Sequence, residues 1–179
     1  MTRITLFFVT IMRKYSKVFK RGILMNIVEN KELFISQATA LVSGEDNLVT
    51  NLSNLSALYK EYLPNTNWVG FYLLDEDNNN LVLGPFQGKV ACTRIPFNKG
   101  VCGHCYTTRE TIYVEDVHKF PGHIACDSAT NSELVVPIIQ NDKVVALLDI
   151  DSIEFNRFSQ EEVTAFSDVT KRVFEKVIF

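Results

Sequence analysis

The stretch VCGHCYTT, residues 101–108, contains Cys102 and Cys105 in a C-x-x-C spacing. The two other cysteines of the chain, Cys92 and Cys126, lie on either side of it. Clustered thiols can carry out dithiol–disulfide exchange, hold a metal ion or include a catalytic nucleophile. The segment around each cysteine must distinguish these chemistries.

A thioredoxin-type site places its first cysteine between a strand and the start of a long helix. Here the polar loop PFNKG precedes Val101 and Cys102, and the helix expected over 100–108 lasts barely two turns. The tetrapeptide matches, but its context does not. We therefore do not expect Cys102 and Cys105 to form a self-contained redox pair.

A structural zinc site needs two pairs of ligands at short spacing. Cys102 and Cys105 provide one pair, whereas Cys92 and Cys126 stand alone on separate segments. His123 and Cys126 are separated by two residues. The sequence therefore leaves open a zinc site with three cysteines and one histidine.

A catalytic thiol needs a polar setting and a second thiol that can reach it. Cys126 lies in the loop PGHIACDSAT with His123 nearby, a setting that can lower the pKa of a thiol. Cys92 lies on a strand expected over 89–95, two residues from Arg94. It is either the partner thiol or a small buried apolar residue.

Two carboxylates follow a strongly apolar run. Asp149 and Asp151 in VVALLDID are two positions apart on an expected strand, so their side chains share one face. Glu133 begins the neighbouring strand. Such a group favours a cationic ligand such as an α-ammonium, and crowding raises one carboxyl pKa so that this group can protonate a substrate oxygen. Trp68 is either a core aromatic or a wall of the same pocket.

The elements that position these residues follow from periodicity and turn signals. We expect two helices between Glu29 and Tyr62, broken at Gly44, and a last helix from the Ser159–Glu162 capping box to Ile178. Between them we expect strands at 67–74, 81–87, 89–95, 111–116, 133–140 and 143–151, the helix 100–108, and a long loop at 117–132. Hairpin-length connections predict an α+β fold with an antiparallel sheet of five or six strands and helices packed on one face.

Length and composition fit one globular domain of 179 residues with 46% apolar residues. The net charge of −3 gives no reason to expect nucleic acid or a membrane as partner. Residues 1–24 carry six basic and no acidic side chains, and the apolar run ITLFFVTIM is too short to span a membrane. We expect 1–24 to be an extension or a start-site artefact, and 25–179 to be the domain. A chain with this core needs no structural disulfides, so we expect a reducing, cytoplasmic setting.

Several runs taken together resemble one family, the free methionine-(R)-sulfoxide reductases, which are stand-alone GAF domains. The resemblance covers the chain from about residue 30 to the C-terminus. The runs are GPFQGKVAC (84–92), NKGVCG (98–103), PGHIACD (121–127), SELVVPI (132–138) and LLDID (147–151). This resemblance implies a GAF-like α+β fold of about six antiparallel strands, with N- and C-terminal helices on one face.

The resemblance also implies roles for matching positions. Cys126 corresponds to the cysteine that attacks sulfur, Cys92 to the resolving cysteine, and Cys102 to a second redox-active cysteine. Pocket positions correspond to Glu133, Asp149, Asp151 and Trp68. Cys105 has no counterpart in the family pattern and could act as an alternative resolving thiol.

The implied reaction is reduction of free methionine sulfoxide through a cysteine sulfenic acid and a disulfide, with thioredoxin as reductant, no cofactor or metal, and a homodimer. The alternatives are a non-catalytic GAF module that binds a small ligand, a redox sensor that uses the same thiols, and a metal-binding structural protein.

Overall fold

The computed structural model describes residues 25–179. The predictions made for residues 1–24 lie outside these residues. In chain order the elements are α2 (Lys31–Val42), α3 (Leu48–Glu61), β1 (Trp68–Asp75), the short 3-10 helix η1 (Glu76–Asn78), β2 (Asn80–Gln87), β3 (Arg94–Pro96), α4 (Gly100–Thr108), β4 (Ile112–Val114), the 3-10 helix η2 (Val117–Lys119), β5 (Ser132–Gln140), β6 (Lys143–Ser152) and α5 (Gln160–Phe174).

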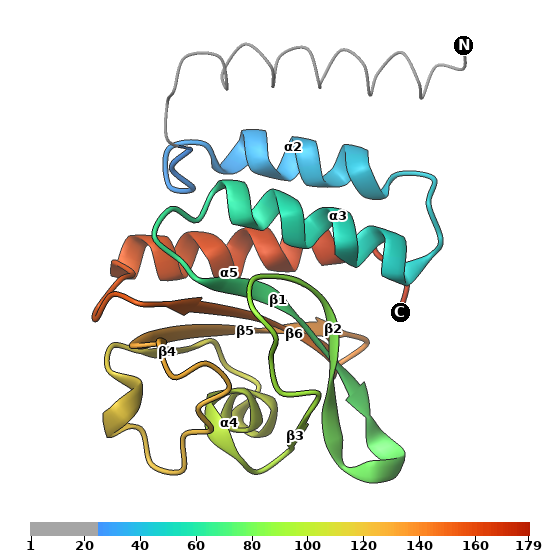
Figure 1. Cartoon of the computed structure of the whole chain (residues 1–179). Coiled ribbons are helices and arrows are strands. Elements are labelled where there is room, and N and C mark those ends of the chain that lie inside the picture. The colour runs from blue at the N-terminus through green and yellow to red at the C-terminus, as the bar shows by residue number, and fades with distance from the viewer. Residues whose placement is uncertain (1–24) are drawn as a thin grey trace.

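The centre of the fold is a six-stranded antiparallel sheet in the order β3-β2-β1-β6-β5-β4. Figure 1 shows α2, α3 and α5 layered over one face of this sheet, and α4 with the loops around it on the other. The predicted α+β class, antiparallel sheet and packing of the N- and C-terminal helices on one face are confirmed. Because β1, β6 and β5 are central neighbours, side chains from three distant segments meet on the α4 face.

Apolar side chains cover both faces of the sheet. The larger cluster lies under α2, α3 and α5 and includes Phe34, Leu55, Tyr59, Phe71, Leu148 and Phe166. Full burial of each such side chain contributes roughly 1.5–3 kcal/mol. The cluster on the α4 face is smaller and contains Trp68, Tyr72, Val135 and Leu147 together with Cys102 and Cys105. The helical face therefore supplies most of the core, and the α4 face can accommodate polar groups.

Helix α5 begins as the sequence predicts. The Ser159 hydroxyl accepts a hydrogen bond from the Glu162 N–H, and the Glu162 carboxylate accepts one from the Ser159 N–H. We expect Ser159→Ala to lower the free energy of unfolding by about 1 kcal/mol, because an N–H of the first turn loses its acceptor. Urea denaturation checks this, with Thr164→Ala, an exposed position on the same helix, as the control. Equal stability of the Ser159→Ala and Thr164→Ala variants would contradict the assigned cap.

Two elements differ most from the sequence prediction, and β4, Ile112–Val114, is also shorter than the strand expected over 111–116. The expected strand 89–95 is only β3, Arg94–Pro96, because side chains of β1 hold the preceding segment off the sheet. The Trp68 indole N–H donates to the Lys89 carbonyl, and the Tyr72 hydroxyl donates to the Cys92 carbonyl. Helix α5 ends at Phe174 rather than Ile178. The Gln140 side-chain amide donates to the carbonyls of Phe174 and Val177 and so holds the chain in its turn away from the helix.

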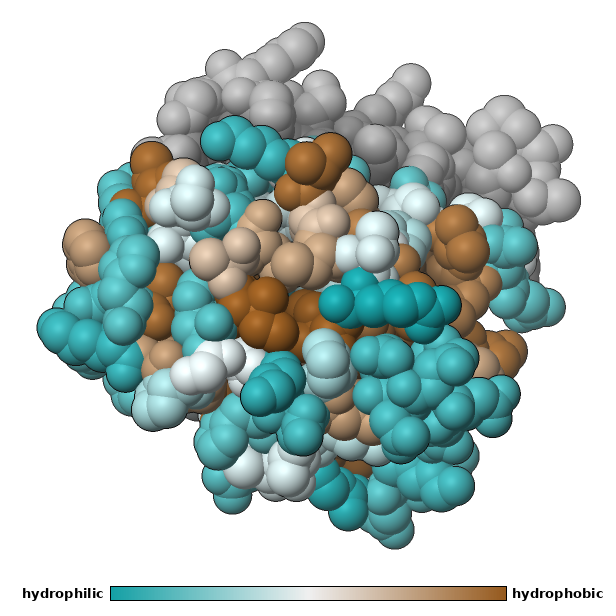
Figure 2. Space-filling view, turned by 60° about the horizontal axis from the view of Figure 1, so that its bottom comes forward, coloured by the Kyte–Doolittle hydropathy of each residue, from teal (hydrophilic) through white to brown (hydrophobic). Residues whose placement is uncertain are grey.

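Within residues 25–179, no helix combines the length and apolar character needed to cross a membrane. Figure 2 brings the lower side of Figure 1 forward, where hydrophilic residues surround a band of apolar side chains.

Candidate active site

The floor of the site is formed by residues paired across β1, β6 and β5. Trp68 pairs with Asp151, and Asp151 pairs with Glu133, so these three side chains form one row across the sheet. Gly70, Asp149 and Val135 form the next row. Directly paired residues, and residues two apart on a strand, point to the same face. Glu133, Asp149 and Asp151 therefore all face α4, as the spacing of the two aspartates predicted.

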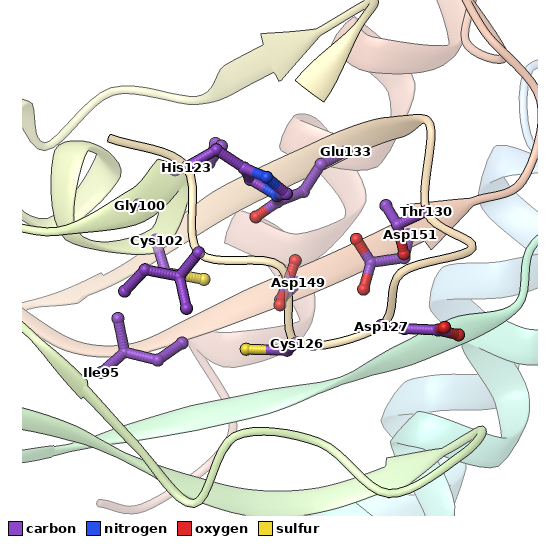
Figure 3. A pocket seen from close by; sticks show the side chains of 12 residues that line it. Ile95, Gly100, Cys102, His123, Cys126, Asp127, Thr130, Glu133, Asp149 and Asp151 are labelled. Carbon is purple, nitrogen blue, oxygen red and sulfur yellow. The ribbon is translucent and has the colours of Figure 1, made fainter. Parts of the chain in front are cut away.

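Helix α4 and the loop 120–131 form the roof of the site. Together with the floor they enclose a small cavity of about 30 Å³, and Figure 3 shows its lining side chains. The residues that line the cavity are Ile95, Gly100, Val101, Cys102, His123, Ile124, Cys126, Asp127, Thr130, Glu133, Asp149 and Asp151. A volume of this size has room for water but not for an amino acid.

Cys92 and Cys126 are joined by a disulfide across 34 residues, with their Cα atoms 5.3 Å apart. The sequence predicted Cys92 on a strand, and this was wrong. Cys92 lies in the irregular segment before β3. Cys126 lines the cavity, whereas Cys92 is absent from its lining. The disulfide therefore connects the wall of the cavity to a segment outside it, and both sulfurs are committed to each other rather than to a metal.

Cys102 and Cys105 are free thiols on α4 and are 2% and 0% exposed. Burial raises the pKa of each thiol, and the nearby carboxyls Asp149 and Glu133 raise it further. The Cys105 thiol donates to the Val135 carbonyl at 3.8 Å, and Cys105 does not line the cavity. The C-x-x-C stretch is thus not a disulfide pair here, because only Cys102 faces the site.

The carboxyls sit in an unusual electrostatic environment. Burial raises the pKa of Glu133, Asp149 and Asp151 well above the usual range, and each is raised further by an acidic neighbour within the group. The Asp149 Oδ1 atom is buried without a hydrogen-bond partner among the described residues. Buried acceptors without donors are costly, so this group favours protons or a cationic ligand.

His123 contacts the carboxyl group of Glu133. Its Nε2 lies 3.6 Å from Glu133 Oε2, and Figure 3 shows the two side chains directed toward one another. Burial lowers the pKa of His123, so the imidazole is neutral at pH 7. The sequence indicated His123 as a neighbour that can lower the pKa of Cys126, and this role stays a prediction. The contact with Glu133 was not indicated by the sequence.

Trp68 is 3% exposed and is absent from the cavity lining, although it belongs to the same row as Asp151. Its ring stacks on Phe86, with ring centroids 5.2 Å apart. A Cβ atom on Gly70 would lie 2.6 Å from the far edge of the indole, so only glycine leaves room there. Trp68 thus lies beside the cavity on the α4 face of the sheet, and its role in binding substrate stays a prediction.

Two further lining residues escaped the sequence prediction. Asp127 accepts hydrogen bonds from the Ala129 N–H and the Asn67 amide, which lower its pKa, and Thr130 also accepts from Asn67. The sequence did contain a hint of both residues, because they follow Cys126 in the polar loop 117–132. Without the fold, however, nothing distinguished them from ordinary turn residues.

Comparison with known proteins adds independent information. Residues 55–171 match the model of the GAF domain family. The chain is 48% identical to a free methionine-R-sulfoxide reductase of Escherichia coli over 139 residues, covering 78% of this chain and 82% of that protein. It is 44% identical to the Saccharomyces cerevisiae protein of the same name over 160 residues, covering 84% and 89%.

Solved structures agree with these relatives. A free methionine-R-sulfoxide reductase from Neisseria meningitidis in complex with its substrate has a TM-score of 0.78 and 38% identity, covering 83% of this chain and 89% of that one. The fRMsr of Staphylococcus aureus in complex with substrate has a TM-score of 0.76 and 44% identity, covering 83% and 96%. The chain therefore belongs to the GAF domain family and, within it, to the free methionine-R-sulfoxide reductases.

Proposed function

We propose that the protein reduces free L-methionine (R)-sulfoxide to L-methionine. The observation that carries this proposal is one cavity that combines three carboxyl groups of raised pKa with Cys126, which is disulfide-bonded to Cys92 outside the cavity. The carboxyls suit a ligand with an ammonium group and an oxygen to be protonated. The paired sulfurs suit the two-electron chemistry that removes this oxygen.

The first half-reaction breaks the S–O bond. The Cys126 thiolate attacks the sulfoxide sulfur, and one protonated pocket carboxyl gives its proton to the oxygen. The hydroxyl then moves from the substrate sulfur to the Cys126 sulfur while the transient S–S bond breaks, so methionine leaves and Cys126 becomes a sulfenic acid. The raised pKa of the carboxyls supports this step, because a proton donor must hold its proton at neutral pH.

The second half-reaction restores the thiols. The Cys92 thiol attacks the sulfenic sulfur, water leaves, and the Cys92–Cys126 disulfide forms. A dithiol protein, thioredoxin in our proposal, then supplies two electrons by thiol–disulfide exchange in the cytoplasm. Cys102 is the second redox-active thiol of the proposal. Its raised pKa keeps it protonated and a poor nucleophile, which supports Cys126 for the initial attack.

Selectivity for the free amino acid follows from the floor of the site. The ammonium group of the substrate lies among the carboxyls of Glu133, Asp149 and Asp151. At least one of these three groups is ionised and pairs with it. A buried cation without such a partner is costly. An amide nitrogen of peptide-bound methionine carries no charge and cannot replace the ammonium group. The proposal also includes a homodimer, which only the resemblance to the family supports.

A direct assay tests the function. Reduced protein, free L-methionine (R)-sulfoxide and dithiothreitol should yield methionine over many turnovers, measured by chromatography. The S epimer and the N-acetyl derivative of the R epimer should yield at least about 100-fold less, since the latter lacks the ammonium charge, worth roughly 3 kcal/mol at a buried site. No methionine from the R epimer would overturn the proposal and favour a GAF module that binds without chemistry.

A further inference from the structure

The polar groups above the floor form a compact cluster of potential metal ligands. The Cys102 Sγ, one carboxylate oxygen of Glu133 and one of Asp149 all lie within 4.8 Å of one another. They come from three elements, α4, β5 and β6, which pack together. The three residues are 2%, 7% and 6% exposed. A cation bound between them would replace water molecules of its hydration shell by these three protein ligands.

One more observation points to a ligand at this place, and a histidine lies beside it. The buried Asp149 Oδ1, on the wall of the cavity, has no hydrogen-bond partner among the described residues. His123 Nε2 lies 3.6 Å from Glu133 Oε2. The imidazole is therefore a neighbour of Glu133, but it does not belong to the group of ligand atoms that lie within 4.8 Å of one another.

We propose that Cys102, Glu133 and Asp149, with a water molecule as fourth ligand, bind a thiophilic divalent cation of the Zn²⁺ class. A thiolate sulfur beside two carboxylate oxygens is a donor set for zinc rather than for magnesium or calcium, which prefer oxygen alone. One thiolate and two carboxylates also compensate the charge of the ion. On binding, the thiol and any protonated carboxyl release their protons to the solvent.

The ion would be an inhibitor rather than a cofactor. Glu133 and Asp149 belong to the subsite that the proposed function assigns to the substrate ammonium, so cation and substrate exclude one another. This part rests on the proposed function, whereas metal binding does not. Neither Cys92 nor Cys126 is a ligand, so the site persists in the disulfide form.

Metal binding is tested first on the disulfide form of the whole chain, where Cys102 and Cys105 are the remaining thiols. Titration with Co²⁺ should give a thiolate-to-cobalt charge-transfer band in the near ultraviolet at one ion per chain, and Zn²⁺ should remove it. Cys102→Ser should abolish the band, and Asp149→Asn should weaken binding at least about 10-fold. Cys105→Ser, a change at a buried thiol three residues away on the same helix, should leave the band intact.

A missing band at millimolar Co²⁺, or a band that survives in Cys102→Ser, would overturn the site. Should Cys102→Ser fail to fold, the Asp149→Asn and Cys105→Ser variants decide the question by the same titration. Inhibition is then measured as the single methionine released by pre-reduced, desalted protein, because dithiothreitol itself binds Zn²⁺. Zn²⁺ should slow this release competitively with methionine sulfoxide. Binding without competition would refute the inhibitory role alone.

Discussion

A Cys126→Ser variant should release no methionine from free methionine-(R)-sulfoxide, even in the first turnover. The hydroxyl of serine is a far weaker nucleophile than a thiolate, and no sulfenic acid can form without sulfur at this position. Cys92→Ser should instead release about one methionine per chain and then stop. Its nucleophile is intact, but the sulfenic acid on Cys126 lacks the thiol to which it is bonded in the structure. Rapid mixing of fully reduced protein with substrate, reduced thioredoxin and a system that keeps the thioredoxin reduced, followed by chromatography, measures both amplitudes.

The matched control is Cys105→Ser. Cys105 is a free thiol that faces the Val135 carbonyl and lies outside the cavity lining, so this variant should turn over repeatedly. Normal turnover by Cys126→Ser would place the nucleophile elsewhere, with Cys102 as the next candidate. Repeated turnover by Cys92→Ser would mean that another thiol, Cys102 or Cys105, resolves the sulfenic acid. A redox sensor would form the disulfide with peroxide but would release no methionine from any variant.

The sequence predicted those parts of the fold that depend on local signals. The Ser159–Glu162 capping box and the hairpins 67–87 and 133–151 are set by neighbours in the chain, and each is found as expected. The segment 89–93 was predicted wrongly, because its backbone carbonyls are used by Trp68 and Tyr72, which are about 20 residues away. A pattern of alternating apolar residues cannot reveal that side chains of β1, rather than the backbone of a neighbouring strand, donate hydrogen bonds to these carbonyls.

Some features of the candidate site also follow from local sequence signals, whereas others depend on the tertiary fold. The shared face of Asp149 and Asp151 follows from the period of a strand, and the structure adds Glu133 by direct cross-strand pairing. The disulfide partner of Cys126 and the contact between His123 and Glu133 depend on how the loop 120–131 folds over the sheet. That loop has no periodicity, so only the resemblance to a family could suggest the pairing of Cys92 with Cys126.

The buried carboxyls should make the ligand-free protein less stable as the pH rises. Burial raises the pKa of Asp149 above that of an aspartate in the unfolded chain, which is about 3.9. Between these two pKa values the native state binds more protons than the unfolded state, so the free energy of unfolding falls with increasing pH. We expect Asp149→Asn, which has no charge to bury, to flatten this profile and to be about 1 kcal/mol more stable than the parent at pH 8. Urea denaturation from pH 5 to pH 8 measures the difference.

The same substitution should impair function while it stabilises the fold. Asp149→Asn removes a group that, in the proposed function, either pairs with the substrate ammonium or gives a proton to the sulfoxide oxygen, so kcat/KM for free methionine sulfoxide should fall about 100-fold, or about 3 kcal/mol. Asp127→Asn is the matched control, because hydrogen bonds lower the pKa of Asp127. Its stabilising contribution is present above the unfolded pKa and is lost as the pH falls, so Asp127→Asn should not stabilise the protein at pH 8. Equal pH profiles for the parent and Asp149→Asn would mean that Asp149 is ionised at neutral pH. The proton for the sulfoxide oxygen would then have to come from Glu133 or Asp151.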